Sequence, residues 1–323
     1  MTSVNGVESD WLKVVCGVPQ GSVLGPLLFL LYTNDLSNAS DFNINLFADD
    51  TCLSLCNKSL NALQIQCNRE AQLVDDWFKA NKLTANSKKA SNFLLSHCTN
   101  KSLTTNFDIQ MGSVQLKRVE SVKYLGVILD DKVSWTDQID NLSKRLSCAA
   151  GIFSKLRYYI DTKTMIEMYH ALFNSKLQYA ILCWGATSAS NISKLQVLQN
   201  KAIRNMNKAP RYYRLDNYYL NQRILKVQDL YHLEIAKFMH SHFHDNLPAC
   251  FTSFFVESRF LHNYATRHSD SRNYNVSNFK TNRGQRSIQY LGPKVWNNVP
   301  NDIRIVSKQN FKNKMKSLIL SRY

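Results

Sequence analysis

Two adjacent carboxylates, Asp49 and Asp50, are the residues of this sequence best suited to hold a divalent cation. They follow the alternating run Phe42–Leu46 and precede Cys52–Leu55, a pattern that predicts a tight β-hairpin with both aspartates at its reversal. Carboxylate oxygens are the ligands that Mg²⁺ prefers. For the pair alone, however, the commoner explanation is turn chemistry, because short carboxylates accept hydrogen bonds from nearby backbone amides. The neighbouring segments must decide between the two.

A loop rich in glycine and proline, Gly17–Pro26, lies upstream of the aspartates and leads into the apolar run Leu27–Tyr32. This order predicts a shaped turn that enters a buried helix, with Pro26 at the first helical position. Glycines such as Gly21 let the backbone approach a ligand closely, and Gln20 offers both a donor and an acceptor. An ordinary loop before a core helix is the alternative for this segment taken alone. The order of loop, helix, short link and Asp-Asp hairpin is more specific than either part.

Four segments of the chain together resemble a known family, the reverse transcriptases of non-LTR (LINE-type, jockey-like) retrotransposons. The family's Gly-Val-Pro-Gln-Gly-Ser-x-Leu-Gly-Pro loop is present without a break at Gly17–Pro26, and its Tyr/Phe-Ala-Asp-Asp hairpin at Phe47–Asp50. Lys82–Lys89 is similar to its Lys-Leu-x-x-Asn-x-x-Lys segment, and the stretch from Val122 to Trp135 is similar to its primer-grip hairpin. Because the four occur in the family's order, chance is a poor explanation.

The resemblance implies an RNA-directed DNA polymerase that extends a DNA primer on an RNA template with two Mg²⁺ or Mn²⁺ ions. Asp49 is the first choice as metal ligand, because successive side chains of a strand diverge and Asp50 would then share or tune the site. Lys89 could donate a proton to the leaving group, although a solvated surface lysine is the plainer alternative. The family pattern implies the following roles: catalytic, Asp49, Asp50 and Lys89; metal binding, Asp49 and Asp50; nucleotide or template binding, Pro19, Gln20, Gly21 and Phe47; primer grip, Tyr124, Leu125 and Gly126.

One essential part of the family pattern has no match in this sequence. Such polymerases draw a further carboxylate from a strand upstream of the loop that contains Gln20, which we call the glutamine loop. Only Met1–Cys16 precede that loop here. Neither Asp10 nor Asp35 is at the family's position. We therefore expect an N-terminally truncated polymerase, inactive alone, whose missing strand and fingers an upstream polypeptide segment would supply. The alternative is a non-catalytic nucleic-acid-binding protein derived from a retroelement.

The charge of the chain favours a nucleic-acid partner. The 323 residues contain 40 Lys and Arg against 24 Asp and Glu. Residues 1–56 hold one basic and six acidic side chains, whereas residues 211–323 hold 18 basic and 7 acidic ones, a net charge of +11. Lysine and arginine neutralise backbone phosphates independently of sequence. Tyrosines near these charges could stack on unpaired bases or could simply bridge core and solvent; they are Tyr212, Tyr213, Tyr218, Tyr219 and Tyr274.

The expected architecture is α+β, with a partial polymerase palm (antiparallel sheet with packed helices) in residues 1–130. A helical, thumb-like region follows in 131–210, and a basic C-terminal region in 211–323 has an irregular segment near 262–287. Apolar residues at helical spacing predict helices over 59–80, with Ser59 as N-cap, and over 137–157. Further helices are expected over about 162–183 and 190–207, and a long one from 211 to about 246.

Membrane and secreted classes are disfavoured by the sequence. The longest apolar stretch, Val23–Tyr32, has ten residues, far fewer than the roughly 20 that a bilayer-spanning helix needs. No basic-then-apolar leader follows Met1, so we expect an intracellular protein of the nucleus or cytoplasm. The eight cysteines lack a Cys-x-x-Cys pair and are expected to be free thiols.

Overall fold

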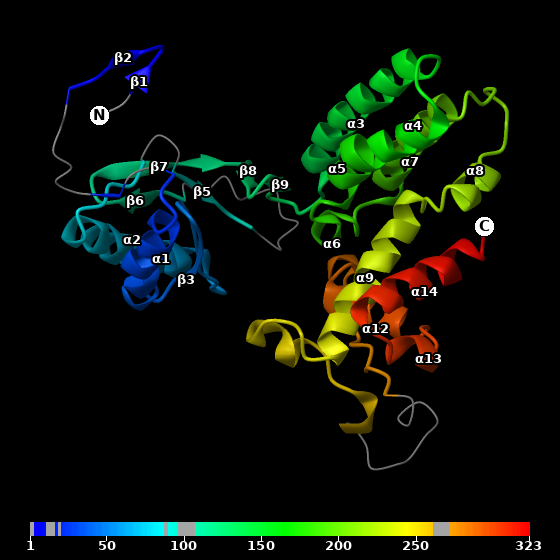
Figure 1. The fold of residues 1–323 in the computed structure, drawn as a ribbon. Coiled ribbons are helices and arrows are strands. Elements are labelled where there is room, and N and C mark those ends of the chain that lie inside the picture. Colours follow the sequence, from blue (N-terminus) through cyan, green and yellow to red (C-terminus); the bar gives the residue numbers. More distant parts are fainter. Residues whose placement is uncertain (1–2, 11–16, 19–20, 87–89, 96–106, 261–271) are drawn as a thin grey trace. The chain divides into compact units, whose positions relative to one another are not determined.

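A computed structural model of the chain describes residues 3–10, 17–18, 21–86, 90–95, 107–260 and 272–323. The chain divides into two compact units between Glu120 and Ser121, which we call the N-terminal unit (1–120) and the helical unit (121–323). Helices and small sheets both occur, as the α+β expectation required (Figure 1). The division falls ten residues earlier than the expected boundary at 130, so the hairpin that follows Glu120 belongs to the helical unit.

The strands of the N-terminal unit form separate small sheets. β1 (Ser3–Val4) pairs with β2 (Val7–Glu8), and β3 (Asn43–Phe47) pairs antiparallel with β4 (Asp50–Ser54). The third sheet has the order β5 (Ser91–Phe93), β7 (Val114–Val119), β6 (Ile109–Met111). β6 is antiparallel to β7, but β5 is parallel to it. The single antiparallel sheet that we expected is therefore not what the described strands form.

Helix α2 (Leu60–Ala80) organises this unit. It begins where predicted, and the Ser59 hydroxyl accepts a hydrogen bond from the Ala62 backbone amide, as an N-cap residue does. The helix packs against β6, where the Asn68 side chain accepts from the Gln110 amide (2.7 Å) and donates to the Asp108 carbonyl (3.2 Å). The predicted helix over 59–80, with Ser59 as its N-cap, is confirmed.

Helix α1 (Gly25–Thr33) differs from its prediction. Its sequence is apolar on every side, a composition typical of a buried helix. In the structure Gly25 and Thr33 are buried, whereas Leu27 is 53% exposed and Leu31 66% exposed. The short 3-10 helix η1 (Asn34–Asn38) follows it. The expectation of a buried helix was wrong: Phe29 is half-buried, but the other apolar side chains of α1 are exposed.

The helical unit begins with a hairpin of β8 (Ser121–Tyr124) and β9 (Val127–Asp130). The predicted helices at 137–157 and 190–207 are confirmed within one residue at each end, whereas the one at 162–183 is divided by a π-helical turn and by a break at Tyr179 and Ala180. The elements are α3 (Thr136–Leu156), α4 (Thr162–Tyr169), the π turn η2 (His170–Asn174), α5 (Ser175–Gln178), α6 (Ile181–Trp184) and α7 (Ala189–Met206).

The expected long helix from 211 to 246 is two helices, α8 (Asp216–Asn221) and α9 (Val227–Phe243). Between them Arg223 has φ of +51°, a left-handed conformation that ends a helix. The turn is held from inside, because the buried Gln199 side chain donates to the Leu225 carbonyl (2.8 Å). The rest of the unit consists of η3 (Ala249–Phe254), η4 (Ser258–Phe260), α11 (Asn282–Gln285), α12 (Ile288–Trp296), α13 (Asn301–Arg304) and α14 (Lys308–Leu320).

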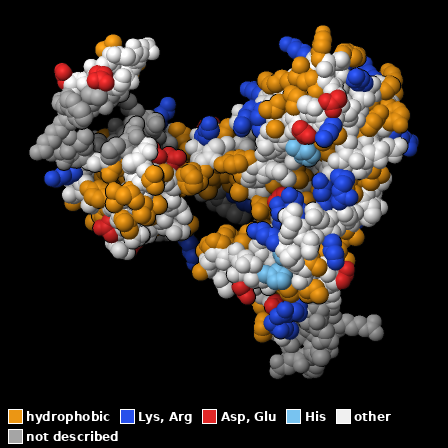
Figure 2. Space-filling view, viewed as in Figure 1, with side chains coloured by type: hydrophobic (Ala, Val, Ile, Leu, Met, Phe, Trp, Pro, Cys, Tyr) orange, Lys and Arg blue, Asp and Glu red, His pale blue; other side chains and the backbone are white. Residues whose placement is uncertain are grey.

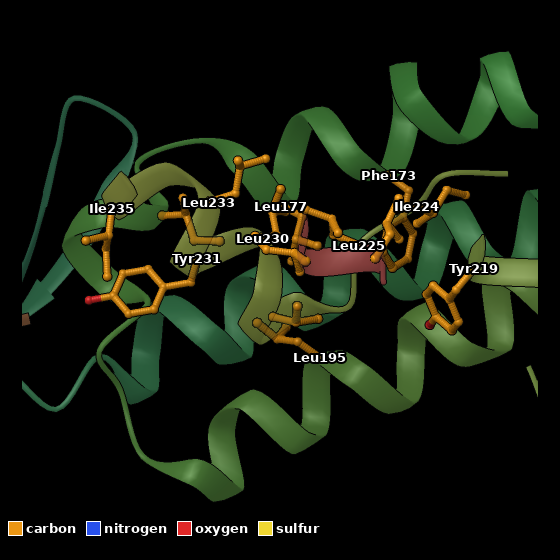
Figure 3. Packing of buried hydrophobic residues seen from close by; sticks show 14 of the residues in the cluster. Phe173, Leu177, Leu195, Tyr219, Ile224, Leu225, Leu230, Tyr231, Leu233 and Ile235 are labelled. Carbon is orange, nitrogen blue, oxygen red and sulfur yellow. The ribbon is translucent and has the colours of Figure 1, made fainter. Parts of the chain in front are cut away.

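One hydrophobic core runs through the whole helical unit. Phe173, Leu177 and Leu195 bring η2, α5 and α7 together, and Leu230 of α9 packs on them (Figure 3). The same cluster continues through Met239 to Trp296, Phe311 and Ile319 of the C-terminal helices. The regions 131–210 and 211–323 therefore both contribute to this core.

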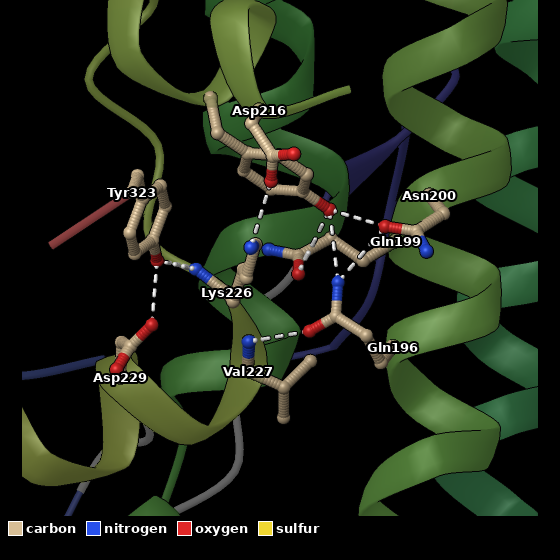
Figure 4. A network of polar contacts seen from close by, with 9 residues as sticks. Gln196, Gln199, Asn200, Asp216, Lys226, Val227, Asp229 and Tyr323 are labelled. Carbon is tan, nitrogen blue, oxygen red and sulfur yellow. Dashed lines mark hydrogen bonds and ion pairs between the residues drawn. The ribbon is translucent and has the colours of Figure 1, made fainter. Parts of the chain in front are cut away.

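A polar network fixes the end of the chain to the helices (Figure 4). The Tyr323 hydroxyl donates to Asp229 (2.7 Å) and accepts from the Lys226 amide (2.6 Å). The Lys226 ammonium pairs with Asp216 at 2.9 Å and lies 4.5 Å from the centre of the Tyr323 ring. The last residue thus contacts the start of α9 through both its hydroxyl and its ring.

The described residues bear on the expected free thiols and on the question of a membrane-spanning helix. The six cysteines among them, Cys52, Cys56, Cys67, Cys148, Cys183 and Cys250, are free thiols, as predicted. Within the same residues no helix combines the length and apolar character that crossing a bilayer requires.

The helical unit should lose stability in mild acid. Burial lowers the pKa of His232, His240 and His242 below the ordinary value of about 6.5. As the pH falls through about 6.5, the unfolded chain gains protons at these rings before the folded one does, so the free energy of unfolding must fall. We expect urea unfolding to give a lower stability at pH 5.5 than at pH 7.5, and a smaller difference in His240→Gln. Equal pH dependence in the variant would contradict a contribution from His240.

Candidate active site and nucleic-acid surface

The Asp-Asp hairpin forms as predicted, except that Asp50 lies on β4 and only Asp49 lies in the reversal. Phe47 and Asp50 are the last cross-strand pair of β3 and β4, so Ala48 and Asp49 form a two-residue reversal. Ala48 has φ of +51°, the left-handed conformation that tight hairpin turns require. The side chains of Phe47, Asp49 and Asp50 are all exposed, and Phe47 is 62% exposed. Both carboxylates are therefore open to a ligand, with Asp49 in the turn and Asp50 on the strand.

A buried carboxylate on α2 holds the start of this hairpin. Glu70 is 1% exposed, and its Oε2 accepts a hydrogen bond from the Asp41 backbone amide at 2.7 Å, two residues before β3 begins. That bond, together with the Arg69 guanidinium beside it, lowers the pKa of Glu70. Sequence reasoning missed Glu70, because a glutamate in a polar helix gives no signal of its burial.

The glutamine loop is described only in part. Gly21 has φ of +85°, and a side chain there would be strained, which explains the choice of glycine. The Ser22 hydroxyl accepts from the Gly25 amide (3.1 Å), and Pro26 is the second residue of α1 rather than the first. Pro19 and Gln20 lie outside the described residues, so their predicted contacts with nucleotide or template stay predictions.

The Lys82–Lys89 segment begins at the end of α2 and is tied to α1. The Tyr32 hydroxyl donates to the Asn81 carbonyl, which joins the helix after the glutamine loop to the start of this segment. Lys82 comes next with φ of +53°. Lys89 lies outside the described residues, and its proposed role as proton donor stays a prediction.

The donor set at the hairpin fits part of a magnesium site. Asp49 and Asp50 supply hard carboxylate oxygens, and Mg²⁺ is commonly held by one or two carboxylates together with water and substrate phosphates. Among the residues that the structure describes, no group of three or more His, Cys, Asp or Glu side chains is placed to hold a metal ion. The two aspartates thus stand without a third carboxylate in the described part of the chain.

The primer-grip candidates form the turn of the β8–β9 hairpin. Leu125 and Gly126 have φ of +46° and +81° between the paired residues Tyr124 and Val127, so the turn resembles type I′. The Tyr179 hydroxyl donates to the Leu125 carbonyl, and its ring lies 3.4 Å from the place of a Cβ on Gly126. Tyr179 was not predicted from sequence, because it lies 54 residues from Leu125 in the chain.

The base of the same hairpin is fixed to α3. Asp130 is 8% exposed, and its two carboxylate oxygens accept from the amides of Ser134 (2.8 Å) and Trp135 (2.7 Å). The Gln138 side chain accepts from the Ile128 amide (3.0 Å). Asp130 and Gln138 therefore position the hairpin, and the segment from Val122 to Trp135 is one structural element.

A basic cavity of about 530 Å³ lies between this hairpin, α3 and α5. Three cationic side chains and no carboxylate line it, a charge that suits a phosphate. Its lining residues are Lys123, Gly126, Asn141, Arg145, Ser175, Lys176 and Tyr179. The visible face of the helical unit shows many Lys and Arg side chains and fewer Asp and Glu (Figure 2).

The predicted stacking tyrosines separate into two groups. Tyr212 and Tyr213 are 92% and 46% exposed, whereas Tyr219 and Tyr274 are 1% and 2% exposed and belong to the core. Tyr218 is half-buried. For Tyr219 and Tyr274 the stacking hypothesis was wrong, because their rings pack against other rings and their hydroxyls bond to protein groups.

Comparison with known proteins supports the resemblance seen in the sequence. Residues 1–129 match the family described as "Reverse transcriptase (RNA-dependent DNA polymerase)". The chain is 24% identical over 238 residues to the "RNA-directed DNA polymerase from mobile element jockey" of Drosophila melanogaster, covering 70% of this chain and 26% of that protein. It is 30% identical over 217 residues to the "Probable RNA-directed DNA polymerase from transposon BS" of the same species, covering 61% and 23%.

These matches cover only part of each relative. The jockey polymerase of Drosophila funebris is 25% identical over 251 residues, 74% of this chain and 27% of that protein. The chain thus spans about a quarter of the length of these relatives. No solved structure matched. With the Phe47–Asp50 hairpin and the family match over residues 1–129, the chain is similar to the reverse transcriptases of non-LTR, jockey-like retrotransposons.

Proposed function

We propose that this chain supplies the palm hairpin and the thumb of an RNA-directed DNA polymerase, which extends a DNA primer on an RNA template. The observation that supports this most is the exposed Asp49–Asp50 pair at the reversal of β3 and β4, within the segment that matches the family. An accessible pair of carboxylates on a rigid hairpin suits nucleotidyl transfer, because catalytic groups must be held in fixed geometry.

Each predicted site residue would have its own role in nucleotidyl transfer. Asp49, with a share from Asp50, would hold Mg²⁺ or Mn²⁺, which activates the primer hydroxyl and neutralises the departing pyrophosphate. Lys89 would donate a proton to that leaving group. Pro19, Gln20, Gly21 and Phe47 would line the place of the nucleotide and template base.

The helical unit would hold the primer–template. The turn at Tyr124, Leu125 and Gly126 would contact the primer backbone, and Lys123, Arg145 and Lys176 in the adjacent cavity would neutralise its phosphates. The rigid attachment of the turn through Tyr179 and Gln138 supports this role, because a primer end must be positioned without freedom.

A second candidate is a nucleic-acid-binding protein without catalysis. It is favoured by the described residues, in which only two carboxylates meet at the hairpin, and by the net charge of +11 in residues 211–323. On either proposal, binding to a primer–template should weaken steeply as salt rises, because phosphate contacts release counterions.

Primer extension separates the two candidates. The chain would be tested alone and also fused in frame behind the part of the jockey polymerase that precedes the matched segment, with an RNA template, a DNA primer and Mg²⁺. We expect no extension by the chain alone and RNA-templated extension by the fusion. A fusion that binds the primer–template in a salt-sensitive way but never extends it would favour the non-catalytic candidate.

A further inference from the structure

Four exposed tyrosines gather at one end of the helical unit, where α3 and α7 both finish. Tyr158 and Tyr159 lie in the turn from α3 to α4, and Tyr212 and Tyr213 lie in the link from α7 to α8. Figure 1 shows that turn and that link at the same end of the unit. The four rings are 68%, 85%, 92% and 46% exposed. Tyrosine rings are usually half-buried, so packing does not account for this group.

The two loops meet through a cation. The Lys208 ammonium, just after α7, lies 5.9 Å from the centre of the Tyr158 ring, and the Arg157 guanidinium lies 4.6 Å from the same ring. Close to this place the Asn205 side chain of α7 donates to the Ala150 carbonyl of α3 (3.0 Å). The turn and the link therefore form one continuous surface, which we call the bundle-end surface: Arg157, Tyr158, Tyr159, Lys208, Arg211, Tyr212, Tyr213 and Arg214.

The bundle-end surface is positively charged: the side chains of Lys208, Arg211 and Arg214 are exposed, and Arg157 is half-buried. Among the ion pairs between described residues, none involves Arg157, Lys208, Arg211 or Arg214. Asp161, the acid of the α3–α4 turn, accepts instead from the Thr164 amide (3.2 Å) and hydroxyl (2.6 Å) as the N-cap of α4. Its carboxylate keeps its charge but is engaged in capping, so Asp161 forms no ion pair with the four cations, whose positive charge outweighs it.

The backbone of both loops is held in place before any ligand arrives. The amides of Tyr159 and Ile160 donate to the Leu156 carbonyl at 2.9 and 3.1 Å. In the other loop the Ala209 amide donates to the Arg204 carbonyl (3.0 Å), and the Tyr213 amide donates to the Pro210 carbonyl (3.2 Å). Rings on fixed backbone cost less entropy to use in binding than rings on a mobile loop.

We propose that the bundle-end surface binds an unpaired stretch of nucleic acid, with bases stacked on the tyrosine rings and phosphates on the surrounding lysine and arginine. Only an unpaired strand offers base faces to a ring, so a duplex fits this surface poorly. The bundle-end surface also lies apart from the basic cavity beside the β8–β9 hairpin. The β8–β9 hairpin packs near the start of α3, and the tyrosines follow its end, about 31 Å away for 21 residues at 1.5 Å each.

The test is equilibrium binding of fluorescent 20-nucleotide single strands, oligo-dT and oligo-rU, against a blunt duplex of equal length, without nucleotides or Mg²⁺. The variant Tyr158→Ala/Tyr159→Ala/Tyr212→Ala should bind both single strands roughly 1,000-fold more weakly, since each of the three lost stacks costs a factor of about ten. Its affinity for the duplex should not change. Tyr158→Phe/Tyr159→Phe/Tyr212→Phe keeps the ring faces and should bind as the natural sequence does.

A matched control exists in the same unit. Phe260 is 70% exposed, and the Arg259 guanidinium lies 4.7 Å from its ring centre, nearly the geometry of Arg157 and Tyr158. Arg259, however, pairs with Glu257 at 2.6 Å, so no free charge accompanies this ring. Phe260→Ala should leave single-strand binding unchanged.

Three results would overturn the proposal. They are unchanged single-strand affinity in the alanine variant, an equal loss on single strand and duplex, or no binding of any oligonucleotide by the natural chain. Failure of nucleotide incorporation by the fusion would leave the binding result intact, because the assay contains no polymerase substrate.

Discussion

Replacement of Asp49 by asparagine should lower RNA-templated nucleotide incorporation by the fused polymerase about 1,000-fold. The change keeps the size of the side chain but removes the charge that attracts a metal ion, and metal ions contribute several kcal/mol to stabilising such transition states. At 1.36 kcal/mol for each factor of ten, a loss of about 4 kcal/mol gives this reduction. Primer–template affinity should change little, because the residue lies in an acidic, exposed turn rather than on the basic surface.

Two matched variants sharpen this experiment. Asp50→Asn removes the same charge one residue later, on β4 and opposite Phe47, and should reduce the rate less than Asp49→Asn does. Asp35→Asn makes the identical change in η1, outside the hairpin, and should leave the rate unchanged. Single-turnover incorporation separates the three. Equal rates for Asp49→Asn and the natural sequence would remove Asp49 from the catalytic site.

The sequence predicted those elements whose caps and apolar spacing lie within the element itself. The Ser59 cap and the apolar spacing after it placed α2, and alternation around Asp49 placed the β3–β4 hairpin. The exposure of α1 could not be predicted in this way, because an apolar sequence does not say which part of a protein covers it. The break between α8 and α9 depends on the contact of Gln199 with Leu225, which no local pattern records.

The candidate site likewise contains parts that local motifs predict and parts that they do not. The carboxylate pair and the β8–β9 turn were found from motifs, whereas their supports, Glu70 and Tyr179, are distant in sequence and carry no signal of their own. The aromatic residues show the limit most clearly. Tyr212 and Tyr219 both lie in Tyr-Tyr pairs only seven residues apart, yet one ring is 92% exposed and the other 1% exposed. Helix packing decides between them.

The C-terminal region shows how a segment of unassigned role contributes to stability. Helix α12 approaches α9 so closely that a Cβ on Gly292 would lie 2.6 Å from the Met239 sulfur. Trp296, at the end of α12, is fully buried, and its ring contacts Phe243 and Phe311 at centroid distances of 5.2 and 6.1 Å. The Arg304 guanidinium lies 5.3 Å from the centre of the Trp296 ring and donates to the Trp296 carbonyl (3.0 Å). The region is therefore part of the core of the helical unit.

Trp296→Ala should accordingly destabilise the helical unit by about 3–5 kcal/mol, the usual cost of removing a large buried aromatic side chain. The variant loses the ring contacts with Phe243 and Phe311 and the surface on which Arg304 lies. Urea unfolding would give the free energy, and hydrogen exchange would show where protection is lost. Because the core is continuous, we expect faster exchange in α9 and also in α7, with no change in α2 of the N-terminal unit.

Two further variants test the cause of that loss. The indole Nε1 of Trp296 is buried without a hydrogen-bond partner among the described residues, so Trp296→Phe keeps an aromatic ring and gives up no bond. It should cost less than Trp296→Ala does, because it leaves a smaller cavity. Ile305→Ala alters a side chain that is 73% exposed, next to Arg304, and should change stability by less than about 0.5 kcal/mol. Loss of protection confined to residues 288–304 in Trp296→Ala would mean that the C-terminal helices form a separate cap, because a shared core must transmit the cavity to α7.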